Sequence, residues 1–143
     1  MEKPILLVED NPMDVDLTVR AFKRNHVTNP IQVARDGEEA IGWIARWARG
    51  EPVPAVILLD LKLPKVDGLE VLRQLKGHPT YRALPVVVLT TSAEDRDVQG
   101  AYGLGVNSYI VKPVSFDHFN QVAAQIDLYW TLLNRPPIVG EMR

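Results

Sequence analysis

Five short apolar segments, separated by longer stretches of helical periodicity, place the strongest constraint on the fold of this chain. They lie at residues 5–8, 31–34, 56–59, 86–89 and 108–111 and are rich in branched side chains, which is typical of β-strands. The first, third and fourth are almost continuously apolar, as expected for strands buried on both faces of a parallel sheet. The second alternates and fits an edge strand.

The stretches between these segments favour helices, at about residues 12–25, 38–48, 68–76, 93–102 and 116–133. Asn11 offers an N-cap before a first-turn proline, and Ser92 precedes the acidic pair Glu94 and Asp95. Regular alternation of strand and helix implies right-handed crossovers. The fold class is therefore α/β, a doubly wound, five-stranded parallel sheet flanked by five helices.

Length and composition indicate one soluble globular domain. The chain has 143 residues, with 16 basic and 18 acidic side chains and a net charge of −2, so no global positive field favours nucleic acid or an acidic membrane. It contains no cysteine, which excludes thiolate metal sites and cysteine nucleophiles. No segment has the ~20 apolar residues of a membrane span or the pattern of a signal peptide, so we expect a cytoplasmic protein.

Polar residues follow the apolar strands at the points where those strands end. Glu9 and Asp10 follow the first strand, Asp60 the third, Thr90 the fourth and Lys112 the fifth. The carboxyl ends of parallel strands share one edge of the sheet, so these side chains are expected to converge. Three carboxylates repel by about 4 kcal/mol per pair at ~4 Å and an effective dielectric of 20, and they need cationic partners.

The converging residues predict a phosphoryl-transfer site. Oxygen ligands without histidine or cysteine suit Mg²⁺, and Lys112 adds a second positive charge. Asp60 could act as a carboxylate nucleophile toward phosphorus, with Lys112 neutralising the transferred oxygens and Thr90 donating a hydrogen bond to one of them. Taken singly, each acid is more often a solvated loop charge. The prediction of a site depends on all of these residues converging.

Five motifs in this order resemble the receiver domains of bacterial two-component response regulators, over about residues 3–132. The motifs are Leu7-Val8-Glu9-Asp10, Leu58-Leu59-Asp60, Leu63-Pro64-Lys65-Val66-Asp67-Gly68, Leu89-Thr90-Thr91-Ser92 and Lys112-Pro113. The resemblance implies a flavodoxin-like fold with strand order 2-1-3-4-5. It also implies a signalling domain that assists its own phosphorylation and dephosphorylation, rather than an enzyme.

The same resemblance implies particular roles for site residues. Asp60 would receive the phosphoryl group from a sensor histidine kinase, and Mg²⁺ would be held by Glu9, Asp10, Asp60 and the backbone carbonyl of Lys62. Thr90 and Tyr109 would form a conformational switch, although Tyr109 could equally be a half-buried strand aromatic. A cis peptide bond would precede Pro113.

Two positions depart from the commonest family pattern. Glu9 replaces an aspartate, and Lys62 stands where asparagine or another residue that tunes dephosphorylation is frequent. The segment 59–68, the Tyr129-Trp130 extension and the lack of an output domain look most like the phytochrome-associated small response regulators, which suggests a bacteriophytochrome as kinase partner. We expect a receiver domain at residues 1–133 and an extended C-terminal segment at 134–143, which the prolines at 136 and 137 interrupt.

Three other functions share parts of this pattern. A phosphatase of the haloacid-dehalogenase type normally needs a second aspartate two residues after the first, where this chain has Lys62. A dinucleotide-binding module is disfavoured because no Gly-x-Gly-x-x-Gly follows the first strand. A pseudo-receiver, which keeps the fold but uses no phosphate, is the remaining rival.

The last predicted helix carries more apolar residues than one face can bury, which suggests a homodimer through this helix and the C-terminal segment. The residues concerned are Tyr129, Trp130, Leu132, Leu133, Ile138 and Val139. The alternative is that the segment folds back over its own domain.

Overall fold

A computed structural model describes residues 2–126 and shows five strands alternating with five helices. The elements are β1 (Ile5–Val8), α1 (Pro12–Arg24), β2 (Ile31–Ala34), α2 (Gly37–Ala48), β3 (Val56–Leu59), α3 (Gly68–Gly77), β4 (Val86–Thr90), α4 (Asp95–Gly103), β5 (Ser108–Val111) and α5 (Phe116–Ile126). All strands are parallel and lie in the order β2-β1-β3-β4-β5. The predicted fold, strand order and edge position of the second strand are confirmed.

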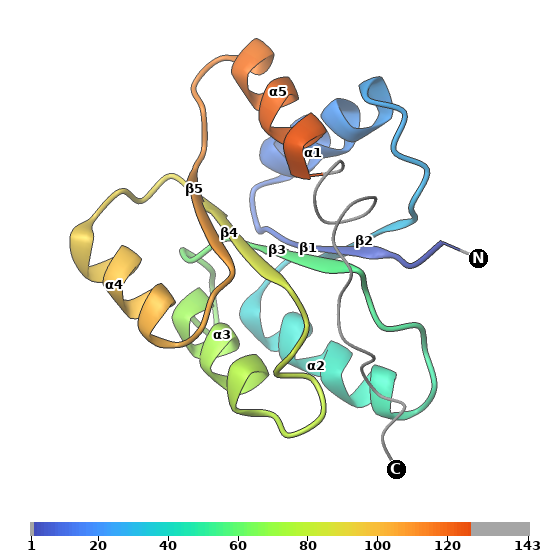
Figure 1. The fold of residues 1–143 in the computed structure, drawn as a ribbon, viewed down its shortest axis with the longest axis vertical. Coiled ribbons are helices and arrows are strands. Elements are labelled where there is room, and N and C mark those ends of the chain that lie inside the picture. Colours follow the sequence, from blue (N-terminus) through green and yellow to red (C-terminus); the bar gives the residue numbers. More distant parts are fainter. Residues whose placement is uncertain (1, 127–143) are drawn as a thin grey trace.

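The sheet separates two apolar cores, one on each face. Helices α1 and α5 cover one face, and α2, α3 and α4 cover the other (Figure 1). Alternate residues of β1 divide between them: Ile5 and Leu7 pack beneath α1 and α5, whereas Leu6 and Val8 pack beneath the other three helices. The second core also contains the buried rings of Trp43 and Trp47. Within residues 2–126, no helix combines the length and apolar character needed to cross a bilayer.

The observed start of α1 agrees with the sequence prediction, whereas that of α4 differs from it. The Asn11 side chain accepts hydrogen bonds from the backbone amides of Met13 and Asp14, which confirms it as the N-cap of α1. Helix α4 begins at Asp95, two residues later than predicted, and Ser92 is not its N-cap. The Ser92 hydroxyl donates to the carboxylate of Asp97 at 2.5 Å, and its oxygen accepts from the backbone amide of Glu94 at 3.4 Å.

The expected cis bond before Pro113 is wrong, because every peptide bond of the described residues is trans. The trans form is favoured by about 0.5–1 kcal/mol even before proline. Helix α5 is described only to Ile126, so the predicted continuation to residue 133 and the C-terminal segment lie outside the described residues.

The loop between β3 and α3 is packed tightly against the first turn of α2. The Gly37 amide donates to the carbonyl of Pro64 at 3.3 Å, and the ammonium of Lys65 lies 3.5 Å from a carboxylate oxygen of Asp36. A Cβ atom on Gly37 would lie 1.8 Å from the carbonyl oxygen of Val66. Glycine is therefore required here because the two backbones touch, and the loop that follows Asp60 is fixed at its far end.

Replacing Gly37 by alanine should lower the free energy of unfolding by at least about 1–3 kcal/mol, the usual cost of overpacking. Gly42→Ala, on the exposed face of the same helix, is the matched control, because a Cβ there meets nothing within 4 Å. It should raise the free energy of unfolding by about 0.5–1 kcal/mol through helix propensity. Urea denaturation measures both changes, and equal stability of the two variants would contradict the packing argument.

Candidate functional site

The strand order brings four polar residues together at the carboxyl edge of the sheet. β1, β3, β4 and β5 are consecutive neighbours, so Glu9, Asp60, Thr90 and Lys112 lie at adjacent strand ends. The ladder continues into these positions: the Asp60 amide donates to the carbonyl of Val8, and the Lys112 amide donates to that of Thr90. The backbone positions of the site are therefore set by the sheet itself.

Lys112 is a buried cation surrounded by three carboxylates. Its ammonium lies 2.5 Å from Glu9 Oε1, 2.8 Å from Asp14 Oδ2 and 3.3 Å from Asp60 Oδ2, and its side chain is only 7% exposed. Burial alone would lower the pKa of Lys112, but the hydrogen bonds to Asp14 and Glu9 and the charge of Asp60 outweigh it and raise the pKa. The lysine is therefore held in its charged form.

The carboxylate of Asp60 is almost fully buried and has a different partner on each oxygen. Oδ1 accepts a hydrogen bond of 2.7 Å from the Thr90 hydroxyl and one of 3.2 Å from the backbone amide of Lys62. Oδ2 faces Lys112. Thr90 is itself fully buried, so its hydroxyl is held against the carboxylate.

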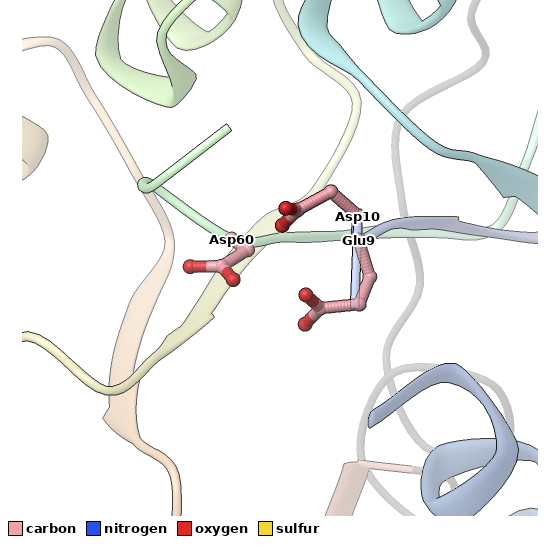
Figure 2. A group of neighbouring side chains, drawn as sticks. All are labelled: Glu9, Asp10 and Asp60. Atoms are coloured by element: carbon pink, nitrogen blue, oxygen red, sulfur yellow. The ribbon is translucent and has the colours of Figure 1, made fainter. Parts of the chain in front are cut away.

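Glu9, Asp10 and Asp60 form a cluster that could hold a divalent cation. Each offers one carboxylate oxygen, and these oxygens all lie within 4.8 Å of one another. The three side chains gather beside the ends of β1 and β3 (Figure 2). Asp10 is exposed, so the cluster is open to water, as magnesium sites usually are.

The charge balance of this cluster also fits a cation. Burial raises the pKa of Glu9 to about 7, and the nearby charge of Asp60 acts in the same direction, against the opposing hydrogen bond from Lys112. The ammonium of Lys112 contacts the carboxylates of Glu9, Asp14 and Asp60, and Asp10 adds a fourth carboxylate beside Glu9 and Asp60. An all-oxygen donor set with excess negative charge suits a small, hard divalent ion.

The side chains of Tyr109 and Lys62 lie beside the site, although the Lys62 backbone amide contacts Asp60. Tyr109 is half-buried on β5, and its hydroxyl donates to the backbone carbonyl of Ser92 at 2.8 Å. Burial raises the pKa of the Tyr109 phenol. The side chain of Lys62 points to helix α4, where its ammonium lies 3.4 Å from Asp97 Oδ2.

Sequence reasoning missed two acids, Asp14 and Asp97, which both lie in first turns of helices. Asp14 contacts Lys112, and Asp97 contacts Ser92 and Lys62. An acid in the first turn of a helix is expected from the helix dipole alone, so neither position carried a distinctive sequence signal. Only the docking of α1 and α4 on the sheet reveals their partners.

Comparison with known proteins gives consistent similarities. The model of the response regulator receiver domain matches residues 5–124. The chain is 47% identical over 134 residues to the probable methanogenesis regulatory protein FilR2 of Methanothrix harundinacea, which covers 93% of this chain and 86% of the relative.

Two solved structures are also similar. The phosphorylated cyanobacterial phytochrome response regulator RcpA has a TM-score of 0.89 and 38% identity, over 96% of this chain and 100% of that one. The Mn²⁺-bound form of the response regulator Rcp1, a protein of Synechocystis, has a TM-score of 0.86 and 36% identity, over 95% of this chain and 99% of that one.

Proposed function

Because this chain belongs to the response regulator receiver family, we propose that it accepts a phosphoryl group on Asp60 from the phosphohistidine of a sensor histidine kinase. The observation that carries the proposal is the position of Asp60, whose two carboxylate oxygens face the Thr90 hydroxyl and the buried Lys112 ammonium. A pseudo-receiver would have no need of a buried cation at this point. The phosphorylated state of the relative RcpA supports the same chemistry.

In the proposed reaction, a carboxylate oxygen of Asp60 bonds to phosphorus while the phosphorus–nitrogen bond of the donor breaks. The bonding electrons leave with the imidazole. Lys112 then balances the charge of the transferred oxygens, and the Thr90 hydroxyl, already 2.7 Å from Asp60 Oδ1, donates to one of them. The chain would thus act as a signalling domain that assists its own phosphorylation and dephosphorylation.

Magnesium is the proposed cofactor. Glu9, Asp10 and Asp60 would hold it with the backbone carbonyl of Lys62, and it would supply the positive charge that neutralises the incoming phosphoryl oxygens. The Mn²⁺-bound state of the relative Rcp1 supports a divalent cation in this family. The kinase partner would be a bacteriophytochrome, by analogy with the phytochrome response regulator RcpA.

Asp60→Asn should abolish magnesium-dependent incorporation of phosphate from acetyl phosphate, because the amide is not a competent nucleophile. Asp95→Asn, which removes one exposed carboxylate from α4, is the control and should label like the wild type. Mass spectrometry of the intact protein measures the added phosphoryl group. Labelling of the Asp60 variant would contradict the assignment, and failure of the wild type to label would favour the pseudo-receiver.

Asp10→Ala should weaken magnesium binding more than tenfold, since it removes one of the three carboxylate ligands. The same change relieves repulsion among the carboxylates, so the metal-free variant should unfold at a temperature no lower than the wild type. Calorimetric titration with MgCl₂ and thermal unfolding in EDTA measure the two effects. An unchanged magnesium affinity would reject this ligand set.

We propose that Thr90 and Tyr109 read the phosphorylated state as a shift between two conformations. A phosphoryl group adds roughly two negative charges and new acceptor oxygens, which draw the Thr90 hydroxyl away from Asp60 Oδ1. Ser92 lies two residues after Thr90, and its backbone carbonyl accepts a hydrogen bond from the Tyr109 hydroxyl. A movement at Thr90 can therefore reach Tyr109. Beryllofluoride with magnesium should therefore shift the NMR signals of the Tyr109 ring, and identical spectra with and without it would count against the switch.

The proposed output is a change in self-association through the last helix and the C-terminal segment, with residues 1–133 as the receiver domain and 134–143 as its extension. Phe119, Ala123 and Ile126 of α5 are buried in the core beneath α1 and α5. The apolar residues assigned to the interface, among them Trp130, lie beyond the described part of the chain. The dimer therefore rests on the sequence pattern.

The protein should be mostly dimeric at about 100 μM if the interface has a ~10 μM dissociation constant. Truncation after Asn134 combined with Trp130→Ala should give a monomer at the same concentration, because the C-terminal segment and the Trp130 ring are both removed. Light scattering across a dilution series measures the mass. A full chain that stays monomeric at about 100 μM would defeat the proposal.

A further inference from the structure

Asp97 is a buried carboxylate with no part in the site described above. It lies in the first turn of α4, and its side chain is only 8% exposed. The Ser92 hydroxyl donates to Oδ2 at 2.5 Å, and this hydrogen bond is the main reason why the pKa of Asp97 is lowered, with Lys62 as a further cause. Asp97 is thus a fixed negative charge beneath the loop that follows β4.

Lys62 is the one cation within ion-pair distance of Asp97 among residues 2–126. The ammonium lies 3.4 Å from Asp97 Oδ2, while the Lys62 side chain is 54% exposed and free to turn. Arg96, the other nearby cation, is directed to Glu94 at 2.8 Å. The two partners of this ion pair differ in mobility, because the Asp97 carboxylate is buried and the Lys62 side chain is exposed and flexible.

The same lysine is also attached to the proposed phosphoacceptor. Its backbone amide donates to Asp60 Oδ1, so its side chain begins next to the atom that would carry the new charge. A neutral second route links Asp60 to the start of α4, from the Thr90 hydroxyl to the Ser92 amide at 3.4 Å. Two connections, one charged and one neutral, therefore run from Asp60 to this helix.

We propose that Asp97 is a positioning residue that holds the Lys62 ammonium on α4 until Asp60 is phosphorylated, when the phosphoryl group draws Lys62 off Asp97. The inference rests on the proposed phosphorylation of Asp60. A phosphoryl group brings roughly two negative charges close to the Lys62 backbone, against the single charge of Asp97. Lysine reaches either site because its four-carbon stem is flexible and exposed.

Release of Lys62 removes the ion-pair partner of Asp97 but not its hydrogen bond from Ser92. The carboxylate keeps the Ser92 hydroxyl and stays at the amino end of α4, where the helix dipole favours a negative group. The loop after β3 then loses its charged attachment to α4, and the link between Asp60 and this helix passes through Thr90 and Ser92 alone. Asp97 and the phosphoryl group are competitors for one lysine.

If Asp97 competes with the phosphoryl group for Lys62, removing its charge should strengthen beryllofluoride binding. If Asp97 only supports α4, the same change should weaken that binding. Asp97→Asn removes the competing charge but retains an oxygen that can accept from Ser92. It should therefore bind beryllofluoride, the phosphoryl mimic, about twofold to fivefold more tightly, the range expected from losing an exposed ion pair. A residue that only supported α4 would weaken binding when changed.

The experiment is a double-mutant cycle on the full chain. Binding of beryllofluoride at saturating magnesium is followed by NMR in the wild type, Asp97→Asn, Lys62→Met and the double variant. The gain from Asp97→Asn should vanish in the Lys62→Met background, because no ammonium is left to release. Lys62→Met alone changes a half-exposed side chain outside the core, and it should bind beryllofluoride more weakly than the wild type.

Two further variants control for charge and fold. Asp95→Asn removes an exposed carboxylate from the same helical turn and should bind like the wild type, and Asp97→Glu should return affinity toward that of the wild type by restoring the charge. If Asp97→Asn bound beryllofluoride no more tightly than the wild type, or if its gain in affinity persisted in the Lys62→Met background, this inference would be overturned while the proposed function would stand. A wild type that binds no beryllofluoride would overturn the proposed function, and this inference with it.

Discussion

The buried ammonium of Lys112 is the interaction on which the site depends. A carboxylate or an ammonium taken out of water alone costs several kcal/mol, so neither Lys112 nor the acids around it could be buried separately. Lys112 contacts Glu9 after β1, Asp60 after β3 and Asp14 on α1, and so joins three elements to the end of β5 at one point. One ammonium does not balance all of these charges, and the negative excess is what makes the site receptive to a divalent cation.

The fold and the core of the site were predictable because the same feature specifies both. Strands buried on two faces must be apolar along their whole length, so a polar residue is tolerated only where the strand ends. Asp60 follows Leu58-Leu59, which are both fully buried, and the interruption in the apolar pattern therefore marks the edge of the sheet. Parallel strands bring such interruptions together from distant parts of the sequence, which is why Glu9, Asp60 and Lys112 could be assigned to one place.

Helical contributions could not be predicted in the same way. Asp14 and Asp97 complete the charge network, but their partners depend on how α1 and α4 dock on the sheet, which periodicity does not specify. The start of α4 shows a related limit: Ser92 has the side chain of an N-cap, but α4 begins only at Asp95, and the Ser92 hydroxyl donates to the buried carboxylate of Asp97. The trans bond before Pro113 likewise departs from the pattern that the family resemblance implied.

The site is rigid on one side and adjustable on the other, and this asymmetry bears on where a charge at Asp60 is transmitted. Toward α2 the chain is held by backbone contact, since a Cβ atom on Gly37 would lie 1.8 Å from the carbonyl oxygen of Val66. Toward α4 and β5 the connections are an exposed lysine arm, Lys62, and a half-buried aromatic ring, Tyr109. The phosphoryl group proposed at Asp60 would therefore meet packed backbone on one side and adjustable side chains on the other. Packed backbone resists movement where exposed side chains do not, so the adjustable contacts of the site lie toward α4 and β5.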